Sequence, residues 1–240
     1  MGRGFTMKTF GKVAVLAMAL ALAMVLAACG GSGSSSAASA SGSASASGSA
    51  SAASASASTD ASSAASSAAK IDFKKGAVSG DTYTNEYFGA KYVLPAGYKF
   101  FTDEQMADAQ LNGATLTDEQ ANEVLASGKE YFDAAAAAES GMPTITFSVV
   151  YAGTPEAQAL DAAAFAQYQA QLVQGEFGAY QNGQTGAEFP AIKRQMEMNG
   201  QKYDQELLFT KSGDCFLVVT ATGAEGTNLD DVLCNFTLTK

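Results

Sequence analysis

The apolar and polar positions of the 240-residue chain divide it into three regions. Val13 to Ala28 is an uninterrupted run of Ala, Val, Leu and Met. Gly30 to Ala69 is almost entirely Ser, Ala and Gly, a composition that cannot bury enough apolar surface to offset the entropy of ordering. Strand and helix patterns appear only beyond it. We therefore predict a signal peptide over residues 1–28, a disordered linker over 29–69 and a single domain over 70–240.

Alternation of apolar and polar residues predicts the strands of this domain. Thr144 to Tyr151 has the clearest two-residue period. Asn199-Gly200 separates two strand-like runs, and this dipeptide is the strongest short signal for a β-hairpin. The five alanines from Ala134 to Ala138 favour helix, so only the first half of 130–138 is predicted as a strand. Besides this segment, the predicted strands are 82–88, 90–94, 144–151, 189–198, 201–210 and 215–222.

Two similar tetrads, Thr102–Gln105 and Thr117–Gln120, predict helix starts. In each, the threonine oxygen can accept from the N3 amide while the glutamine reaches back, which is a capping box. Their acidic pairs could instead hold a divalent cation, but a calcium loop of the form D-x-[DN]-x-[DN]-G is absent. We therefore expect helices over 103–111, closed by Asn112-Gly113, and over 118–126.

Two further helices are predicted in the second half of the domain. One starts at Asp161, and its Phe165, Tyr168 and Leu172 recur at helical spacing, so we expect these three side chains to face the core. The other covers Thr227 to Phe236. Together with the strands, these helices predict an α+β fold in which an antiparallel β-sheet packs against helices.

The apolar run near the N-terminus ends in a tetrad that resembles a bacterial lipobox: Leu26, Ala27, Ala28 and Cys29. The resemblance implies cleavage before Cys29 after its thiol has been joined to diacylglycerol, which leaves lipidated Cys29 as the mature N-terminus. The run has 16 residues, fewer than the roughly 20 that a membrane-spanning helix needs. Either Met1 or Met7 can be the true start. The expected location is the outer face of a bacterial cytoplasmic membrane, with the domain on a tether of roughly 35 Å.

The charge of the chain limits the partners it can bind, and its cysteines allow one possible disulfide. The net charge is -10, and every acidic residue lies at Asp60 or later. Nucleic acid is not an expected partner, because binding it requires clustered Lys and Arg. Cys215 and Cys234 could form a disulfide in an exported domain or remain two buried thiols, and the sequence leaves both open.

The sequence offers no catalytic, cofactor-binding or metal-binding signature. It contains no histidine, so the usual general base and zinc ligand are missing. Two segments loosely match motifs of penicillin-interacting serine enzymes: Ser67-Ala68-Ala69-Lys70 fits S-x-x-K, and Lys211-Ser212-Gly213 echoes K-T-G. The first follows a tract without helix signals, and the second is a good turn sequence, so we do not expect this activity.

A glycosidase would need a pair of carboxylates, with candidates among Glu188, Glu197, Asp204 and Glu206, all of which also fit solvated strand faces. Lys193-Arg194 is the main basic pair of the domain. Consecutive strand residues point to opposite faces, so we expect a solvated strand rather than a basic patch.

Three segments resemble small extracytoplasmic lipoproteins of Gram-positive bacteria related to the PsbP/Mog1 fold: Tyr83–Gly89, Leu94–Tyr98 and Thr102–Gln105. The resemblance implies an α-β-α arrangement with an antiparallel sheet. It carries over no catalytic residue, because members of this fold act mainly as assembly factors, partners of small GTPases or proteins of unknown role.

Two classes of function and one less favoured alternative follow. The first is a non-enzymatic, lipid-anchored binding or assembly module for an envelope protein or cell-wall component. The second is a lipoprotein that captures a small molecule or metal, which predicts a concave apolar pocket. A carboxylate-dependent hydrolase is the less favoured alternative and would need two buried acids about 5 to 9.5 Å apart.

Overall fold

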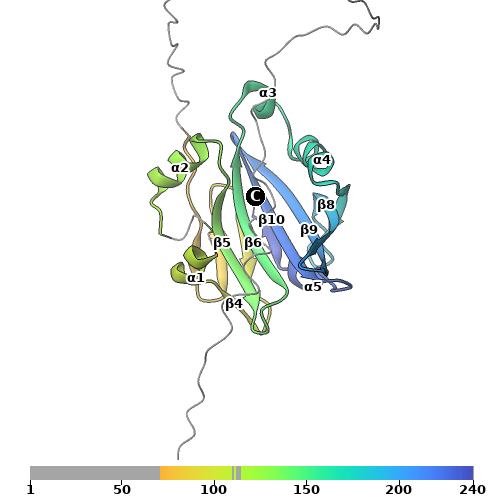
Figure 1. Cartoon of the computed structure of the whole chain (residues 1–240). Coiled ribbons are helices and arrows are strands. Elements are labelled where there is room, and N and C mark those ends of the chain that lie inside the picture. The colour runs from red at the N-terminus through yellow and green to blue at the C-terminus, as the bar shows by residue number, and fades with distance from the viewer. Residues whose placement is uncertain (1–70, 110, 112–114, 240) are drawn as a thin grey trace, which may run out of the picture. The chain divides into compact units, whose positions relative to one another are not determined.

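The computed structural model describes residues 71–109, 111 and 115–239, and these form an α+β fold of two antiparallel sheets with five helices (Figure 1). The coarse prediction of antiparallel strands with helices is thus confirmed. The predicted signal peptide, Cys29, the linker and Asn112-Gly113 lie outside the described residues. Within the described residues, no helix is long and apolar enough to cross a membrane.

The larger sheet has seven strands, and each neighbouring pair is antiparallel. The hairpin around Asn199-Gly200 is confirmed, and both residues have positive φ, 52° and 75°. Such a turn matches the twist of the two strands it joins. In sheet order the strands are β4 (Tyr98–Phe100), β5 (Tyr131–Ala138), β6 (Thr144–Tyr151), β10 (Cys215–Ala224), β9 (Gln201–Ser212), β8 (Glu188–Met198) and β7 (Glu176–Gln181).

A smaller, four-stranded sheet covers one face of the larger one. Its strands, in order, are β1 (Ala77–Ser79), β2 (Thr82–Asn85), β3 (Ala90–Val93) and β11 (Phe236–Leu238). The main core lies between the two sheets and is rich in aromatic side chains. Tyr83 of β2 stacks on Phe147 of β6 with ring centroids 4.4 Å apart. Burying such large rings from both sheets is what holds the two layers together.

Three helices cover parts of the opposite face of the larger sheet: α1 (Asp103–Asp108), α3 (Pro155–Gln158) and α4 (Ala162–Val173). The other two, α2 (Asp118–Ala126) and α5 (Asp230–Leu233), bury side chains in the main core. Helix α4 contacts β8 and β9, and Phe165 stacks on Phe216 at 3.9 Å between ring centroids. Met106 of α1 packs in a separate small cluster with Ala135 of β5. The sheet therefore has an aromatic core on one side and two helix-covered clusters on the other.

The predicted core stripe of α4 is only partly correct. Phe165 is buried, but Tyr168 and Leu172 are each 44% exposed. The buried face instead continues through Ala166, Gln169 and Ala170. The two alanines let the helix approach the sheet closely, and the larger Tyr168 and Leu172 lie away from it.

Both capping boxes are confirmed, with side-chain and backbone hydrogen bonds in each direction. Helix α2 has the predicted bounds and is followed by Gly128 at a φ of 75°. Helix α1 ends at Asp108, before the predicted Leu111. The two threonine-led tetrads therefore act as helix starts.

The alanine run is strand rather than helix, which corrects the prediction for its second half. All of Tyr131–Ala138 is β5, paired with β6 on one side and, through its last residues, with β4 on the other. Ala134 and Ala136 lie in the core between the sheets, while Ala135 packs under α1. Pairing on both edges outweighs the helix propensity of alanine, which is a weak prior in tertiary context.

The C-terminal helix is also much shorter than predicted. Only Asp230–Leu233 is helical, and Phe236–Leu238 forms β11 beside β3. The side chain of Asn182 donates to the carbonyl oxygens of Cys234 and Phe236 at 2.9 Å each. These bonds satisfy carbonyls after the helix and hold Phe236 in the core, where a continued helix could not place it.

Candidate functional site

The two cysteines beyond the lipobox are free, so the structure does not contain the disulfide that the sequence left open. Cys215 is buried, and burial raises the pKa of its thiol to about 12. Cys234 is half-buried and accepts a hydrogen bond from Gln184 Nε2 at 3.2 Å. Cys215 therefore behaves as a small core residue, whereas Cys234 does not belong to the core.

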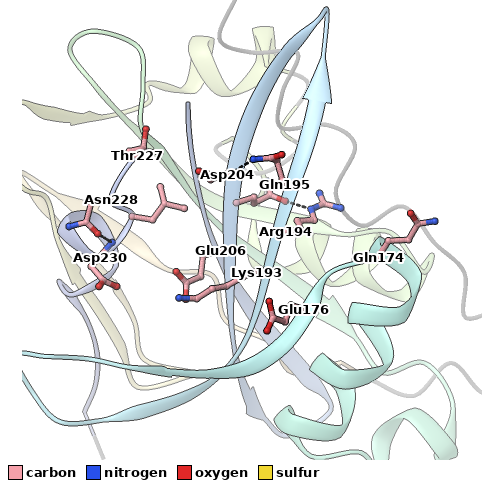
Figure 2. A pocket seen from close by; sticks show the side chains of 12 residues that line it. Gln174, Glu176, Lys193, Arg194, Gln195, Asp204, Glu206, Thr227, Asn228 and Asp230 are labelled. Atoms are coloured by element: carbon pink, nitrogen blue, oxygen red, sulfur yellow. Dashed lines mark hydrogen bonds and ion pairs between the residues drawn. The ribbon is translucent and has the colours of Figure 1, made fainter. Parts of the chain in front are cut away.

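A cavity of about 530 Å³ lies beside the β8–β9 hairpin (Figure 2). One wall is the segment that leads into α5, and another is the end of α4 with the start of β7. We call this cavity the hairpin pocket. Its lining residues are Gln174, Glu176, Lys193, Arg194, Gln195, Asp204, Gln205, Glu206, Thr227, Asn228, Leu229 and Asp230.

An ion pair lies at the centre of the hairpin pocket. Lys193 of β8 and Glu206 of β9 are direct cross-strand partners, and Nζ lies 3.3 Å from Oε1. The two side chains differ sharply in exposure, 63% for Lys193 and 6% for Glu206. Oε1 of Glu206 has no aligned hydrogen bond among the described residues. The carboxylate is thus buried in the pocket floor, with a largely solvent-exposed lysine as its charge partner.

The surroundings of Glu206 disfavour its ionised form. Burial raises the pKa of Glu206, the nearby Lys193 opposes that rise, and Asp230 adds to it. A carboxyl group with a shifted pKa in a cavity is a candidate functional group, although structural ion pairs shift pKa values too. The position of Glu206 in the floor of a cavity also supports a functional role.

Arg194 projects from the opposite face of β8, as the strand alternation predicted (Figure 2). Its Nε donates to Gln205 Oε1 at 2.7 Å, and Gln205 Nε2 donates onward to Thr222 Oγ1 at 2.9 Å. Burial lowers the pKa of Arg194. The basic pair is therefore not a patch, but the prediction of a solvated strand missed that both residues line a cavity.

The outer wall of the pocket is fixed to the hairpin by hydrogen bonds. Asp204 accepts from the Gly226 amide at 2.6 Å and from Gln195 Nε2 at 3.2 Å. Asn228 Oδ1 accepts from the Asp230 amide at 3.3 Å, which orders the first turn of α5. The bond between Asp204 and Gly226 ties this wall to the hairpin, whereas the bond between Asn228 and Asp230 is internal to the wall.

The four acids considered for a glycosidase separate in the structure. Asp204 and Glu206 line the hairpin pocket, whereas Glu188 and Glu197 do not. The buried acids of the described residues are Asp133 and Glu206. They lie on β5 and β9, with β6 and β10 between, which places their strands about 14 Å apart. That separation exceeds the range in which a carboxylate pair flanks a glycosidic bond.

Asp133 is the second buried acid, and sequence reasoning did not single it out. Its carboxylate accepts from Tyr83 Oη at 2.6 Å, Asn85 Nδ2 at 2.8 Å and the Gly76 amide at 2.8 Å and 2.9 Å. It lies where the β5–β6 register shifts, between Phe132 and Ala134. A β-bulge there turns the side chain toward the smaller sheet, so Asp133 joins the two sheets.

The described residues contain no group of three or more acidic, cysteine or histidine side chains arranged to hold a metal ion. The lipobox residues and Ser67–Ala69 lie outside these residues, as does Lys70. Lys211, of the segment that echoes K-T-G, donates through Nζ to the carbonyl oxygens of Gln158 and Leu160, the latter at 2.7 Å.

No family model and no curated protein matches the sequence. A solved structure of a protein from Bacteroides thetaiotaomicron is similar at a TM-score of 0.39 and 12% identity, covering 69% of this chain. This chain spans less than half of that protein, 48% of its length. A likeness of this size says nothing about what either molecule does. The fold is of the α+β class, with two antiparallel sheets.

Proposed function

We propose that the protein is a non-enzymatic, lipid-anchored binding or assembly module on the outer face of a bacterial cytoplasmic membrane. The observation that carries this proposal is the tetrad Leu26–Cys29 at the end of a 16-residue apolar run. Diacylglycerol on Cys29 with a further acyl chain anchors stably, whereas one chain of myristoyl size binds only marginally. The partner is an envelope protein or a cell-wall component.

The PsbP/Mog1-like fold is part of the same proposal. The support is the resemblance of Tyr83–Gly89 and Leu94–Tyr98 to that group. Helices on the far side of a seven-stranded sheet are compatible with an α-β-α arrangement, although a four-stranded sheet takes one of its faces. Assembly factors of this fold are non-enzymatic, which is the role proposed here.

Capture of a small molecule is the second candidate, and the hairpin pocket favours it. Its volume of about 530 Å³ falls within the roughly 300–1,000 Å³ of small-molecule sites. The lining is charged and polar, in contrast to the apolar pocket expected from the sequence. This candidate is therefore restricted to polar or charged ligands.

Expression in a Gram-positive host tests the anchor. The N-terminal peptide of the mature protein, analysed by mass spectrometry, is expected to begin at Cys29 and to carry diacylglycerol. Cys29→Ala should abolish this modification and the membrane fractionation of the protein. Cys234→Ala is the matched control and should change neither. An unmodified Cys29 in a membrane-bound protein would contradict the proposal.

A further inference from the structure

The hairpin pocket contains a buried carboxylate whose charge is only loosely compensated. Glu206 is 5% exposed, and its Oε1 makes no aligned hydrogen bond among the described residues. A buried carboxylate normally acquires well-directed donors, because leaving its charge unpaired is costly. Here the nearest donor is an ammonium group on a side chain that is 63% exposed. The position therefore has an acceptor in place and a donor that is free to leave.

Lys193 shows which chemical group fits this position. Its Nζ lies 3.3 Å from Glu206 Oε1 at the end of a flexible alkyl stem. A primary ammonium group from another molecule, entering on a similar stem, meets the same carboxylate when Lys193 swings into solvent. The cost is small, because an ion pair with an exposed lysine contributes little.

The charges around Glu206 favour a cation over an anion. Asp230, Asp204 and Glu176 also line the pocket (Figure 2). Arg194 also lines the pocket, but with Lys193 it gives two basic side chains against four acidic ones, so the lining keeps an excess of negative charge. Side chains that can bond neutral polar groups complete the lining, namely Gln195, Thr227 and Asn228.

We propose that the hairpin pocket binds a primary ammonium group on a short alkyl stem, with Glu206 as its acceptor and Lys193 as the internal group it displaces. The ammonium belongs either to a lysine-like side chain of a peptide or to a free polyamine. This inference rests on the proposed binding function and names the ligand chemistry for it. It does not depend on the lipid anchor.

Calorimetric titration of the full-length chain in mild detergent at about pH 8 tests the inference. The probes are N-acetyl-lysine methylamide, 1,4-diaminobutane and the uncharged isostere N-acetyl-norleucine methylamide. At least one amine should bind, and the isostere should bind roughly tenfold or more weakly, because it lacks the charge-assisted hydrogen bond. Binding of the lysine amide alone indicates a peptide ligand, and binding of the diamine alone indicates a polyamine. No binding of either amine would overturn the inference without affecting the anchor.

Variants assign the acceptor. Glu206→Gln keeps the shape of the side chain and should weaken amine binding by about tenfold or more. Glu188→Gln, an exposed glutamate outside the pocket, is the matched control and should bind as the wild type does. Amine binding by Glu206→Gln at wild-type strength would overturn the inference, and the comparison of the lysine amide with its isostere stands even if this variant unfolds.

Lys193→Met tests whether Lys193 is displaced by the ligand or itself binds the ligand. If Lys193 is the group displaced, this variant retains amine binding at wild-type strength or tighter. If the variant loses binding, Lys193 itself holds the ligand and the inference is wrong.

Discussion

Two buried carboxylates, Asp133 and Glu206, are placed in opposite ways. Asp133 accepts four hydrogen bonds from three residues and lies between the sheets. Glu206 has an exposed lysine as its ion-pair partner and lies in the floor of a cavity. Burial raises the pKa of both. The contrast shows that a shifted pKa alone does not distinguish a structural acid from a binding acid. The distinguishing feature is whether the carboxylate oxygens accept hydrogen bonds from the protein.

The largest expected effect is from Asp133→Ala. This change leaves the Tyr83 hydroxyl, the Asn85 amide and the Gly76 amide without their shared acceptor. Each buried donor left unsatisfied costs about 1–3 kcal/mol, so we expect a loss of about 3 kcal/mol or more in urea-induced unfolding. Asp81→Ala, at an exposed position, should change the free energy of unfolding by less than about 0.5 kcal/mol. A loss below about 1 kcal/mol for Asp133→Ala would contradict the structural role.

Asp133→Asn should be nearly as damaging as the alanine variant. The new amide group points donors at a site where three donors already converge, so at least one polar group stays unpaired. A loss of about 2 kcal/mol is expected in the same unfolding assay. Tolerance of asparagine would show that Asp133 is not needed as an acceptor.

Stability should also depend on pH through Glu130, whose side chain keeps some exposed surface while its carboxyl group is surrounded by protein. Burial raises the pKa of Glu130 to about 7, opposed in part by a hydrogen bond with Ser148. The unfolded value is about 4.3, so between about pH 4.3 and 7 the folded state holds more protons than the unfolded state. Stability from this group is therefore full at low pH and falls as pH rises, with a slope of at most about 1.4 kcal/mol per unit.

Glu130→Gln checks this pH effect, because it removes the titrating group. Unfolding free energies measured from about pH 4 to 8 should show a flatter profile in this variant than in the wild type. An identical slope in both proteins would show that Glu130 does not titrate in this range.

The smallest effect is expected for Glu206→Gln. The ion pair with Lys193 is half in solvent, and glutamine removes a buried charge without changing shape. The free energy of unfolding should change by less than about 1 kcal/mol, in either direction. A loss as large as that of Asp133→Asn would mean that Glu206 is structural, and the contrast between the two acids would fail.

Much of the fold follows from local signals in the sequence. The two threonine-led tetrads start helices because capping involves residues only three positions apart. Asn199-Gly200 makes its hairpin because both residues tolerate positive φ. These elements were predicted with nearly correct bounds.

The errors occur where distant segments decide the outcome. The alanines of β5 are strand because β6 and β4 pair with them, and Phe236 enters a strand because β3 lies beside it. The hairpin pocket was missed for the same reason. Lys193 and Glu206 could be matched by counting back from the Asn199-Gly200 turn, but no local pattern places Asp230 near them.

A thermal-shift measurement tests the contrast between the two acids most directly. The full-length chain and its Glu206→Gln variant are heated with and without N-acetyl-lysine methylamide or 1,4-diaminobutane, whichever binds the wild type more tightly, at about 100 times its dissociation constant. Such a ligand stabilises by about 2.7 kcal/mol, which corresponds to a rise in Tm of roughly 5 to 10 °C. If Glu206 is the acceptor, this rise appears in the wild type and the Tm of the variant changes little. An equal rise in both proteins, or none in the wild type, would contradict it.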